Sequence, residues 1–136
     1  MLDISNNLFH GHIPKEMGGH LPSLTNLYLS RNDFDGSVPS SVGDMNLLHL
    51  VECCTSLKFL ILSIISLQGQ IFFSNFNLTK LLRLQLDGNN FMGNIPNSLS
   101  KASNLEGLYL SANNISGRIP SWLGNMSSLE DYCHAQ

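Results

Sequence analysis

Histidine and cysteine are the residue types in this sequence that could bind a metal ion or act as a nucleophile. His10 and His12 stand two residues apart with His20 nearby, but no carboxylate or cysteine lies at an offset that would complete a tetrahedral site. The three cysteines are Cys53, Cys54 and Cys133. None belongs to a CxxC pair, so they define neither a zinc site nor a disulfide framework, and we interpret them as incidental. Since phosphate-binding glycine loops and kinase signatures are also missing, we predict no enzyme activity, no catalytic residue, no metal site and no cofactor.

Three Asn-x-Ser/Thr triplets could carry an N-linked glycan. Their asparagines are Asn77, Asn114 and Asn125. Such triplets are used only in secreted chains and at exposed positions, so they indicate a secreted parent protein. The chain itself begins MLDISNN, without the basic start and apolar stretch of a secretory signal.

Composition limits the classes of partner. Of the 136 residues, 43% are hydrophobic and 12% are charged, which is typical of a folded chain. A formal net charge of −3 without a Lys/Arg cluster argues against nucleic acid as a partner. The longest apolar run, FLILSIISL at 59–67, is far shorter than the roughly 20 residues of a membrane-spanning helix, so we expect no direct membrane insertion by this segment.

An internal repeat determines which elements position these residues. The leucines at 57, 81, 105 and 129 are evenly spaced along the chain. A fixed period of roughly 24 residues indicates a solenoid, so we predict one domain over 1–136. Its units are approximately 1–23, 24–47, a truncated 48–56, 57–80, 81–104, 105–128 and a partial 129–136.

Within each unit, leucines alternate with polar residues, as in a short strand with one buried face. The leucines expected to point inward are Leu27, Leu29, Leu60, Leu62, Leu84, Leu86, Leu108 and Leu110. One unit cannot bury this face alone, so stacked units should form a parallel sheet over a continuous core. Asparagine follows the strand where the chain turns, glycine follows at a position of close backbone approach, and proline suits the end of a second short strand.

The pattern LxxLxLxxNxLxGxIP resembles the leucine-rich repeat, and its GxIP half is similar to the plant extracellular subclass of receptor-like proteins, receptor-like kinases and polygalacturonase inhibitors. The resemblance implies an α/β solenoid: a horseshoe fragment with a parallel concave sheet, second short strands at LxGxIP, and short helical or irregular convex returns. It also implies a ladder of stacked asparagines, formed by Asn7, Asn32, Asn89 and Asn113.

Outward strand positions line the concave sheet, which is the usual binding face of a solenoid. Tyrosine and arginine are enriched at binding hot spots, and this guides the choice of candidates. The candidate partner-binding residues are Asn26, Tyr28, Arg31, Arg83, Gln85, Asp87 and Tyr109. We expect the partner to be a protein or peptide ligand or a co-receptor.

The repeat is irregular in its middle. The interval from Leu24 to Leu57 is longer than one period and shorter than two, so segment 48–56 lacks the asparagine turn and the GxIP strand. We expect a bulge or defect there. Ile65 replaces the ladder asparagine and should leave backbone groups of the turn unpaired, and Phe72 replaces the proline. The stack should therefore be weakest around 48–72.

The resemblance favours a protein- or peptide-binding module, a truncated piece of a plant cell-surface receptor-like protein in defence or developmental signalling. The parent would lie at the plasma membrane on the extracellular side, with any kinase elsewhere. One alternative is a secreted inhibitor of the polygalacturonase-inhibitor kind. Another is a truncated gene product without function, since neither end resembles the paired-cysteine caps of the plant family, and such a chain should be marginally stable and self-associating.

Overall fold

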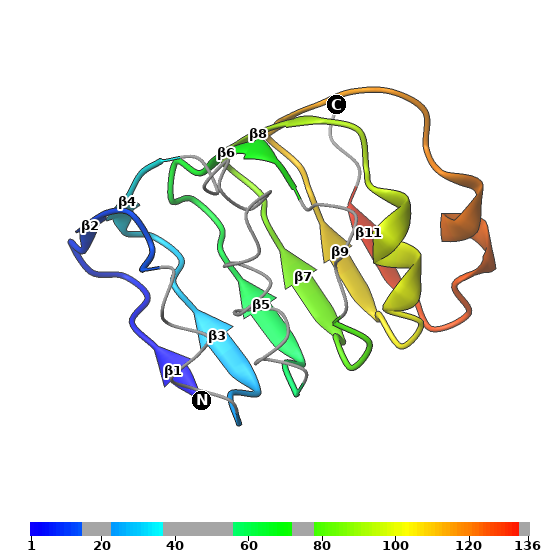
Figure 1. Cartoon of the computed structure of the whole chain (residues 1–136), viewed down its shortest axis with the longest axis horizontal. Helices are drawn as coiled ribbons and strands as arrows, with labels where there is room; N and C mark the ends of the chain where they lie inside the picture. Colours follow the sequence, from blue (N-terminus) through cyan, green and yellow to red (C-terminus); the bar gives the residue numbers. More distant parts are fainter. Residues whose placement is uncertain (15–22, 37–55, 72–77, 134–136) are drawn as a thin grey trace.

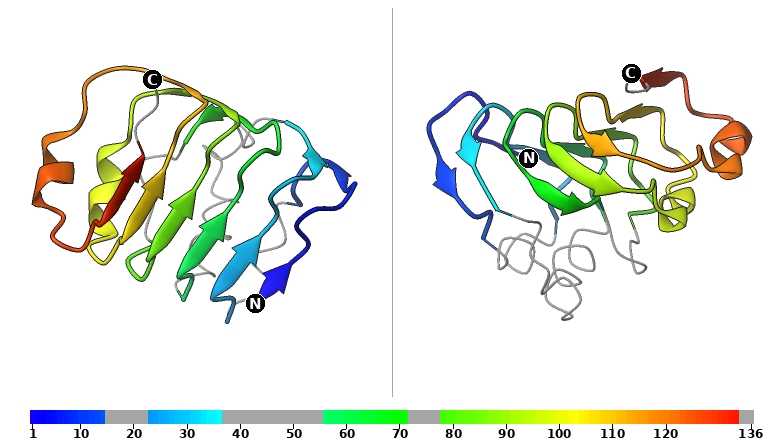
Figure 2. Two further views of the ribbon diagram at one scale, coloured as in Figure 1. Left: turned by 180° about the vertical axis from the view of Figure 1, so that it is seen from behind. Right: turned by 90° about the horizontal axis from the view of Figure 1, so that it is seen from above.

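Six short strands lie side by side in one parallel sheet (Figure 1). A computed structural model describes residues 1–14, 23–36, 56–71 and 78–133. In spatial order the strands are β1 (Leu2–Asp3), β3 (Asn26–Tyr28), β5 (Phe59–Ile61), β7 (Arg83–Gln85), β9 (Gly107–Tyr109) and β11 (Asp131–Cys133). The coils follow one another from the N-terminal to the C-terminal end, as the view from above shows (Figure 2). The expected solenoid with a parallel sheet is confirmed.

The inward leucines form the core because the strands pair in register, repeat against repeat. Leu27 lies opposite Leu60, Leu60 opposite Leu84, and Leu84 opposite Leu108. All four are buried, as are the leucines two residues further along in three of these coils: Leu29, Leu86 and Leu110. Leu62 is the exception, since it is only partly buried. Each leucine column thus runs through the stack, so that every coil buries the apolar face of its neighbours.

Five second strands form the edge of the stack beyond the turns. They are β2 (His10–Gly11), β4 (Asp33–Phe34), β6 (Gln68–Gln70), β8 (Asn90–Gly93) and β10 (Asn114–Ile115). They pair as β2–β4 and as β10–β8–β6. Each of these strands ends near the glycine of its repeat, before any Ile-Pro or Val-Pro step. The strand therefore covers only the first half of the LxGxIP segment.

The proline role predicted from sequence is wrong for Pro96 and Pro120. Pro96 and Pro120 do not end a strand but stand at the N-caps of two 3₁₀ helices, η2 (Asn97–Lys101) and η3 (Ser121–Asn125). Their φ angles are −74° and −64°, the values that the proline ring imposes, and each carbonyl accepts the first bond of its helix. In the described part of the chain the helical returns of the convex side are therefore 3₁₀ turns.

The irregular spacing in the middle does not interrupt the concave sheet. β3 pairs directly with β5, with Asn26 opposite Phe59 and Tyr28 opposite Ile61, although the interval between their two repeats is longer than one period. The expected defect at 48–56 lies almost wholly outside the described residues, as does Phe72. The second row of strands is divided at this point, because β4 and β6 belong to different sheets.

Asparagine side chains connect the coils behind the large sheet. Asn32 donates to the carbonyls of Ile4 and Leu29 and accepts from the Phe9 amide. Asn113 repeats this pattern, since it donates to the Leu86 and Leu110 carbonyls and accepts from the Phe91 amide. Each asparagine thereby bonds its own coil and the coil before it.

Asn89 has the same role for the coil that lacks an asparagine of its own. It donates to the Leu62 carbonyl at 2.7 Å and accepts from the Leu67 amide at 2.9 Å, with Ile65 N–H at 3.4 Å from the same oxygen. Ile65 itself is fully buried in the core. The expectation that its turn would be left without hydrogen bonds was therefore wrong, because the next coil supplies them.

Candidate functional site

The outward strand positions form three rows that cross the concave sheet. The first row is Asn26, Phe59, Arg83 and Gly107, and the second is Asp3, Tyr28, Ile61, Gln85 and Tyr109. The third row lies two residues further along each coil, just after the strands, and consists of Ser5, Ser30, Ser63, Asp87 and Ser111. Because strand neighbours are about 4.8 Å apart, these rows place side chains of several coils within reach of one extended ligand.

Arg83 and Tyr109 form a packed pair on this face. The Arg83 guanidinium carbon lies 5.7 Å from the centre of the Tyr109 ring, a cation–π contact between β7 and β9. Both side chains lie over Gly107, where an added Cβ would come within 2.9 Å of the tyrosine ring and 3.4 Å of Arg83 Nε. The missing side chain at Gly107 thus makes room for the pair, which fixes the guanidinium on the face.

Asn26 and Tyr28 are the predicted residues on β3. Asn26 Nδ2 donates to the Tyr28 hydroxyl at 2.9 Å, so the two side chains lie together on one strand. Both are half-buried. They stand two strands away from Arg83 and Gln85 on β7, with β5 between them.

Arg31 and Asp87 lie beyond the strands that sequence reasoning assigned to them. Arg31 is exposed in the turn after β3 with a φ of 56°, in the left-handed region. Asp87 follows β7 and accepts a 2.7 Å hydrogen bond from the Ser63 hydroxyl. This leaves Arg31 available to a partner, while Asp87 already has a donor.

A strip of apolar side chains in the middle of the face was not selected from the sequence. Phe59 and Ile61 on β5 are half-buried, and Ile64 in the following turn is 51% exposed. An added Cβ at Gly88 would meet Ile64 Cγ1 at 3.0 Å, so Ile64 leans over the glycine of the next coil. The sequence does distinguish this coil: its first two outward positions are both apolar, whereas each of the remaining coils has at least one polar residue there.

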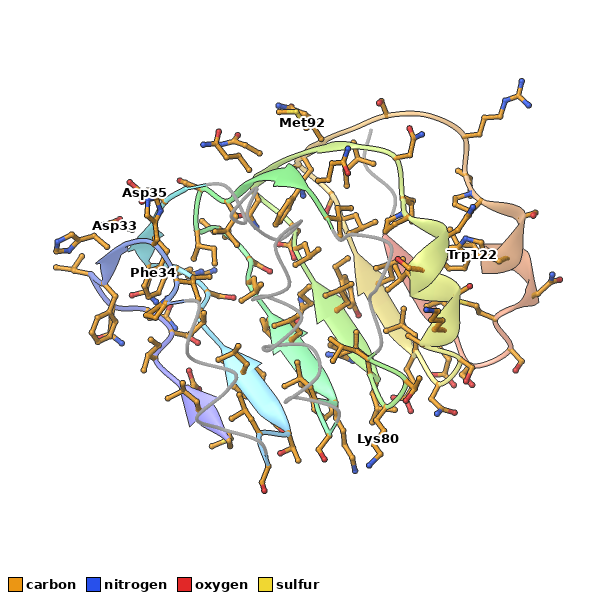
Figure 3. The ribbon with its side chains drawn as sticks, viewed as in Figure 1. Asp33, Phe34, Asp35, Lys80, Met92 and Trp122 are labelled. Atoms are coloured by element: carbon orange, nitrogen blue, oxygen red, sulfur yellow. The ribbon has the colours of Figure 1, made fainter. Side chains whose placement is uncertain are left out.

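The remaining polar candidates lie away from this face. Of the histidines, His10 and His12 are exposed, and His12 Nδ1 lies 3.4 Å from an Asp35 carboxylate oxygen. Asp35 lies beside Asp33 and Phe34 of β4 at the edge formed by the second strands (Figure 3). Met92 on β8 lies at this same side of the stack, and Lys80 before β7 lies at the opposite side. His20 lies outside the described residues, and among those described no three His, Cys, Asp or Glu side chains form a potential metal site.

Two of the three potential glycan acceptors have described positions. Asn114 is exposed on β10 and Asn125 is exposed at the end of η3, whereas Asn77 lies outside the described residues. Over the described ranges no helix has the length and apolar character needed to cross a membrane.

One ionisable group near the face has a shifted pKa. The Ser5 hydroxyl donates to an Asp3 carboxylate oxygen at 2.6 Å and the Ser5 amide donates to the same oxygen at 3.0 Å. These bonds favour the charged carboxylate and lower the pKa of Asp3. Asp3 therefore carries a negative charge at the N-terminal end of the second row.

Comparisons with known proteins identify the repeat. The Leucine Rich Repeat family model matches residues 23–45, 80–102 and 104–126, which together make up half of the chain. Receptor-like protein 15 of Arabidopsis thaliana is 37% identical over 121 residues, covering 77% of this chain. The chain spans about 12% of the length of that relative.

Solved structures share the fold over nearly the whole chain. The ectodomain of the Arabidopsis receptor kinase HAESA, in complex with an extended IDA peptide hormone, has a TM-score of 0.82 and 32% identity, covering 99% of this chain and 21% of its own. A second HAESA structure, with a TM-score of 0.78 and 34% identity over 94% of this chain and 20% of its own, also holds the co-receptor SERK1. A plant ice-binding protein has a TM-score of 0.79 and 34% identity, covering 99% of this chain and 42% of its own, so the fold also serves other functions. The register of the leucines, the asparagine bonds and these matches lead to one conclusion: the chain belongs to the leucine-rich repeat family, in its plant type, and is similar to a segment of the receptor-like proteins.

Proposed function

We propose that this chain is part of the ligand-binding surface of a plant cell-surface receptor-like protein, and that it binds a protein or peptide ligand on its concave sheet. The observation that carries the proposal is the face itself. Four neighbouring coils present, in order, a tyrosine, an apolar strip, an arginine and a second tyrosine on which the arginine rests. Aromatic and arginine side chains on a rigid support are the groups that dominate protein recognition.

The rigidity of the support favours this use of the face. The strands that carry Tyr28, Arg83 and Tyr109 are fixed by the buried leucines beneath them and by the asparagine bonds at their ends. Arg83 already rests on the Tyr109 ring, so less side-chain entropy is lost when a ligand binds. The HAESA ectodomain, which shares the fold, is bound to a peptide hormone, and this supports a peptide as the class of ligand.

An extracellular location at the plasma membrane follows from the same proposal. The relatives are receptor-like proteins, and the exposed Asn114 and Asn125 would be accessible to glycan transfer in a secreted chain. We assign the segment a role in binding and none in catalysis. The co-receptor seen with HAESA makes a second protein a further potential partner of the parent receptor.

A peptide-capture experiment tests the proposal. The full chain, secreted from insect cells, would be immobilised and used to select from a library of random peptides displayed on phage. A variant with Tyr28→Ala, Arg83→Ala and Tyr109→Ala should lose most capture. The matched control, Lys101→Ala with Arg118→Ala, changes exposed cations outside the strands of the large sheet and should retain capture.

Two results would refute the proposal. One is equal capture by the concave-face variant and the control. The other is no capture by a folded wild-type chain, and inhibition of pectin-degrading hydrolases by that chain would then favour the inhibitor alternative.

A further inference from the structure

We infer that the concave face selects an extended acidic peptide in which an apolar side chain lies between two carboxylates. This inference rests on the proposed function and specifies its ligand. The apolar side chain would lie on the β5 strip, defined as Phe59, Ile61 and Ile64, and the carboxylates would meet Arg31 and Arg83 on the coils at either side.

The β5 strip is the apolar part of this surface. Its three side chains come from one coil and cross the face along the strand direction. Ile64 is half exposed and projects over Gly88, where a larger residue would fill the space that it occupies. An isoleucine exposed in a left-handed turn is unusual, since β-branched residues strain that conformation. The strip is therefore suited to receive an apolar side chain of a ligand.

The two arginines that flank the strip make no ion pair within the described ranges, where the one contact of that kind joins His12 and Asp35. Arg83 is half-buried and oriented by Tyr109, and Arg31 is exposed. A guanidinium binds a carboxylate through paired hydrogen bonds, and this contact strengthens when one partner is partly removed from water. Acidic groups are thus the ligand chemistry that this pair would recognise.

Cations outnumber acids around the strip. Lys58 is exposed immediately before β5, and Lys80 is exposed where the chain enters β7 (Figure 3). Asp87 on β7's coil accepts from the Ser63 hydroxyl and keeps its negative charge, so one acid lies among the four cations Arg31, Lys58, Lys80 and Arg83. Further along the stack the sign reverses, because Glu106 and Glu130 are exposed before β9 and β11. An acidic ligand is therefore favoured over coils 24–47 to 81–104 and disfavoured beyond them.

The geometry limits the spacing of the acidic groups. Arg31 and Arg83 are separated by two strand spacings, about 10 Å, and by five positions along the strands, about 16 Å, so their Cα atoms lie about 19 Å apart. An extended peptide advances about 3.3 Å per residue, so glutamates four residues apart span about 13 Å, and the long side chains of arginine and glutamate cover the remaining distance of about 6 Å. Side chains at alternate positions of an extended peptide point the same way, so the central residue would face the strip with them.

Three synthetic peptides test this inference on the full chain. All have the same Gly/Ser flanks, and their centres are Glu-Ala-Phe-Ala-Glu, Gln-Ala-Phe-Ala-Gln and Glu-Ala-Ala-Ala-Glu. Binding would be measured by fluorescence anisotropy at low and high salt. We expect the first peptide to bind at least about tenfold more tightly than either of the others at low salt, with the advantage over the glutamine peptide reduced at high salt.

Matched variants connect the selectivity to the named residues. Arg83→Gln and Arg31→Gln should each remove most of the preference for glutamate over glutamine, whereas Arg118→Gln should retain it, since Arg118 is exposed outside the strands of the large sheet. Glu106→Gln should tighten binding of the glutamate peptide, because it removes a repelling charge. Circular dichroism would confirm that each variant is folded.

The outcomes separate this inference from the function on which it rests. Equal binding of the glutamate and glutamine peptides would overturn the acidic requirement, and equal binding of the phenylalanine and alanine peptides would overturn the role of the strip. If random peptides are captured through the concave face but none of the three binds, this inference is refuted and the proposed function stands. If a folded chain captures no peptide at all, both are refuted.

Discussion

Replacing Asn89 with leucine should destabilise the stack more than any change at an exposed asparagine, because Asn89 is the hydrogen-bonding partner of a coil that has no asparagine of its own. The leucine side chain has nearly the same shape as asparagine but neither donates nor accepts. Asn89 is 6% exposed, so water has little access to the groups left behind.

The structure indicates how many groups would lose their partner. The Leu62 carbonyl and the Leu67 amide are bonded by Asn89 at 2.7 Å and 2.9 Å. The Leu86 carbonyl also accepts from Asn89, but it keeps a 2.8 Å bond from Asn113. The Ile65 amide, 3.4 Å from the Asn89 oxygen, also loses its acceptor. Three groups are thus left unpaired, and at about 1–3 kcal/mol for each the expected loss is about 3–9 kcal/mol in the free energy of unfolding. A domain with a total stability of about 5–15 kcal/mol would be severely weakened.

Urea denaturation of the purified chain, followed by circular dichroism, measures this loss. The control is Asn7→Leu, because Asn7 is exposed and its two bonds, to the Ile4 and Ser5 carbonyls, lie within its own turn. That change should cost less than about 1 kcal/mol, as surface changes usually do. Hydrogen exchange should also show that the Leu67 amide loses protection in the Asn89 variant. Equal costs for the two variants, or an unchanged Leu67 amide, would refute the reasoning about shared asparagines.

Three further predictions follow from the same structure. Ile65→Asn should lower the free energy of unfolding by much less than about 4 kcal/mol, a loss seen only for the most damaging core substitutions. The reason is that the new amide would lie where the asparagines of the other coils bond the preceding coil. Urea denaturation measures the loss, and a value above about 4 kcal/mol would contradict the prediction. Ser5→Ala should raise the pKa of Asp3 by removing the hydroxyl bond that lowers it, as NMR titration would show. In the wild type the small stabilisation from this bond is present above the ordinary aspartate pKa of about 3.9, and it is lost as the pH falls through the lower pKa of the folded state. An unchanged Asp3 pKa in the variant would contradict the assignment. In the chain secreted from insect cells, Asn114→Gln should remove one glycan, seen as a loss of mass that matches enzymatic deglycosylation at that position; an unmodified Asn114 in the secreted wild type would show that this exposed site is not used.

Several features of the molecule could be predicted from the sequence because they depend on local pattern. Leucines at alternate positions can be buried only on one face of a strand, and a fixed repeat period places the same face in every coil. The inward leucines, the parallel sheet and the positions of Tyr28, Arg83 and Tyr109 follow from this. The pattern also indicated which asparagines stand at the turns.

Other features depend on what the neighbouring coil contributes, and only the tertiary structure decided them. Whether Ile65 leaves its turn unsatisfied depends on Asn89, one repeat later in the chain, and the pairing of β3 with β5 depends on contacts across an irregular interval. The seating of Arg83 on Tyr109 depends on the absence of a side chain at Gly107. The physical reason is common to these cases: in a solenoid each backbone group and each side chain on a strand is completed by the coil beside it. A single repeat specifies its own shape, whereas its partners, and so the chemistry of its binding face, are specified by the stack.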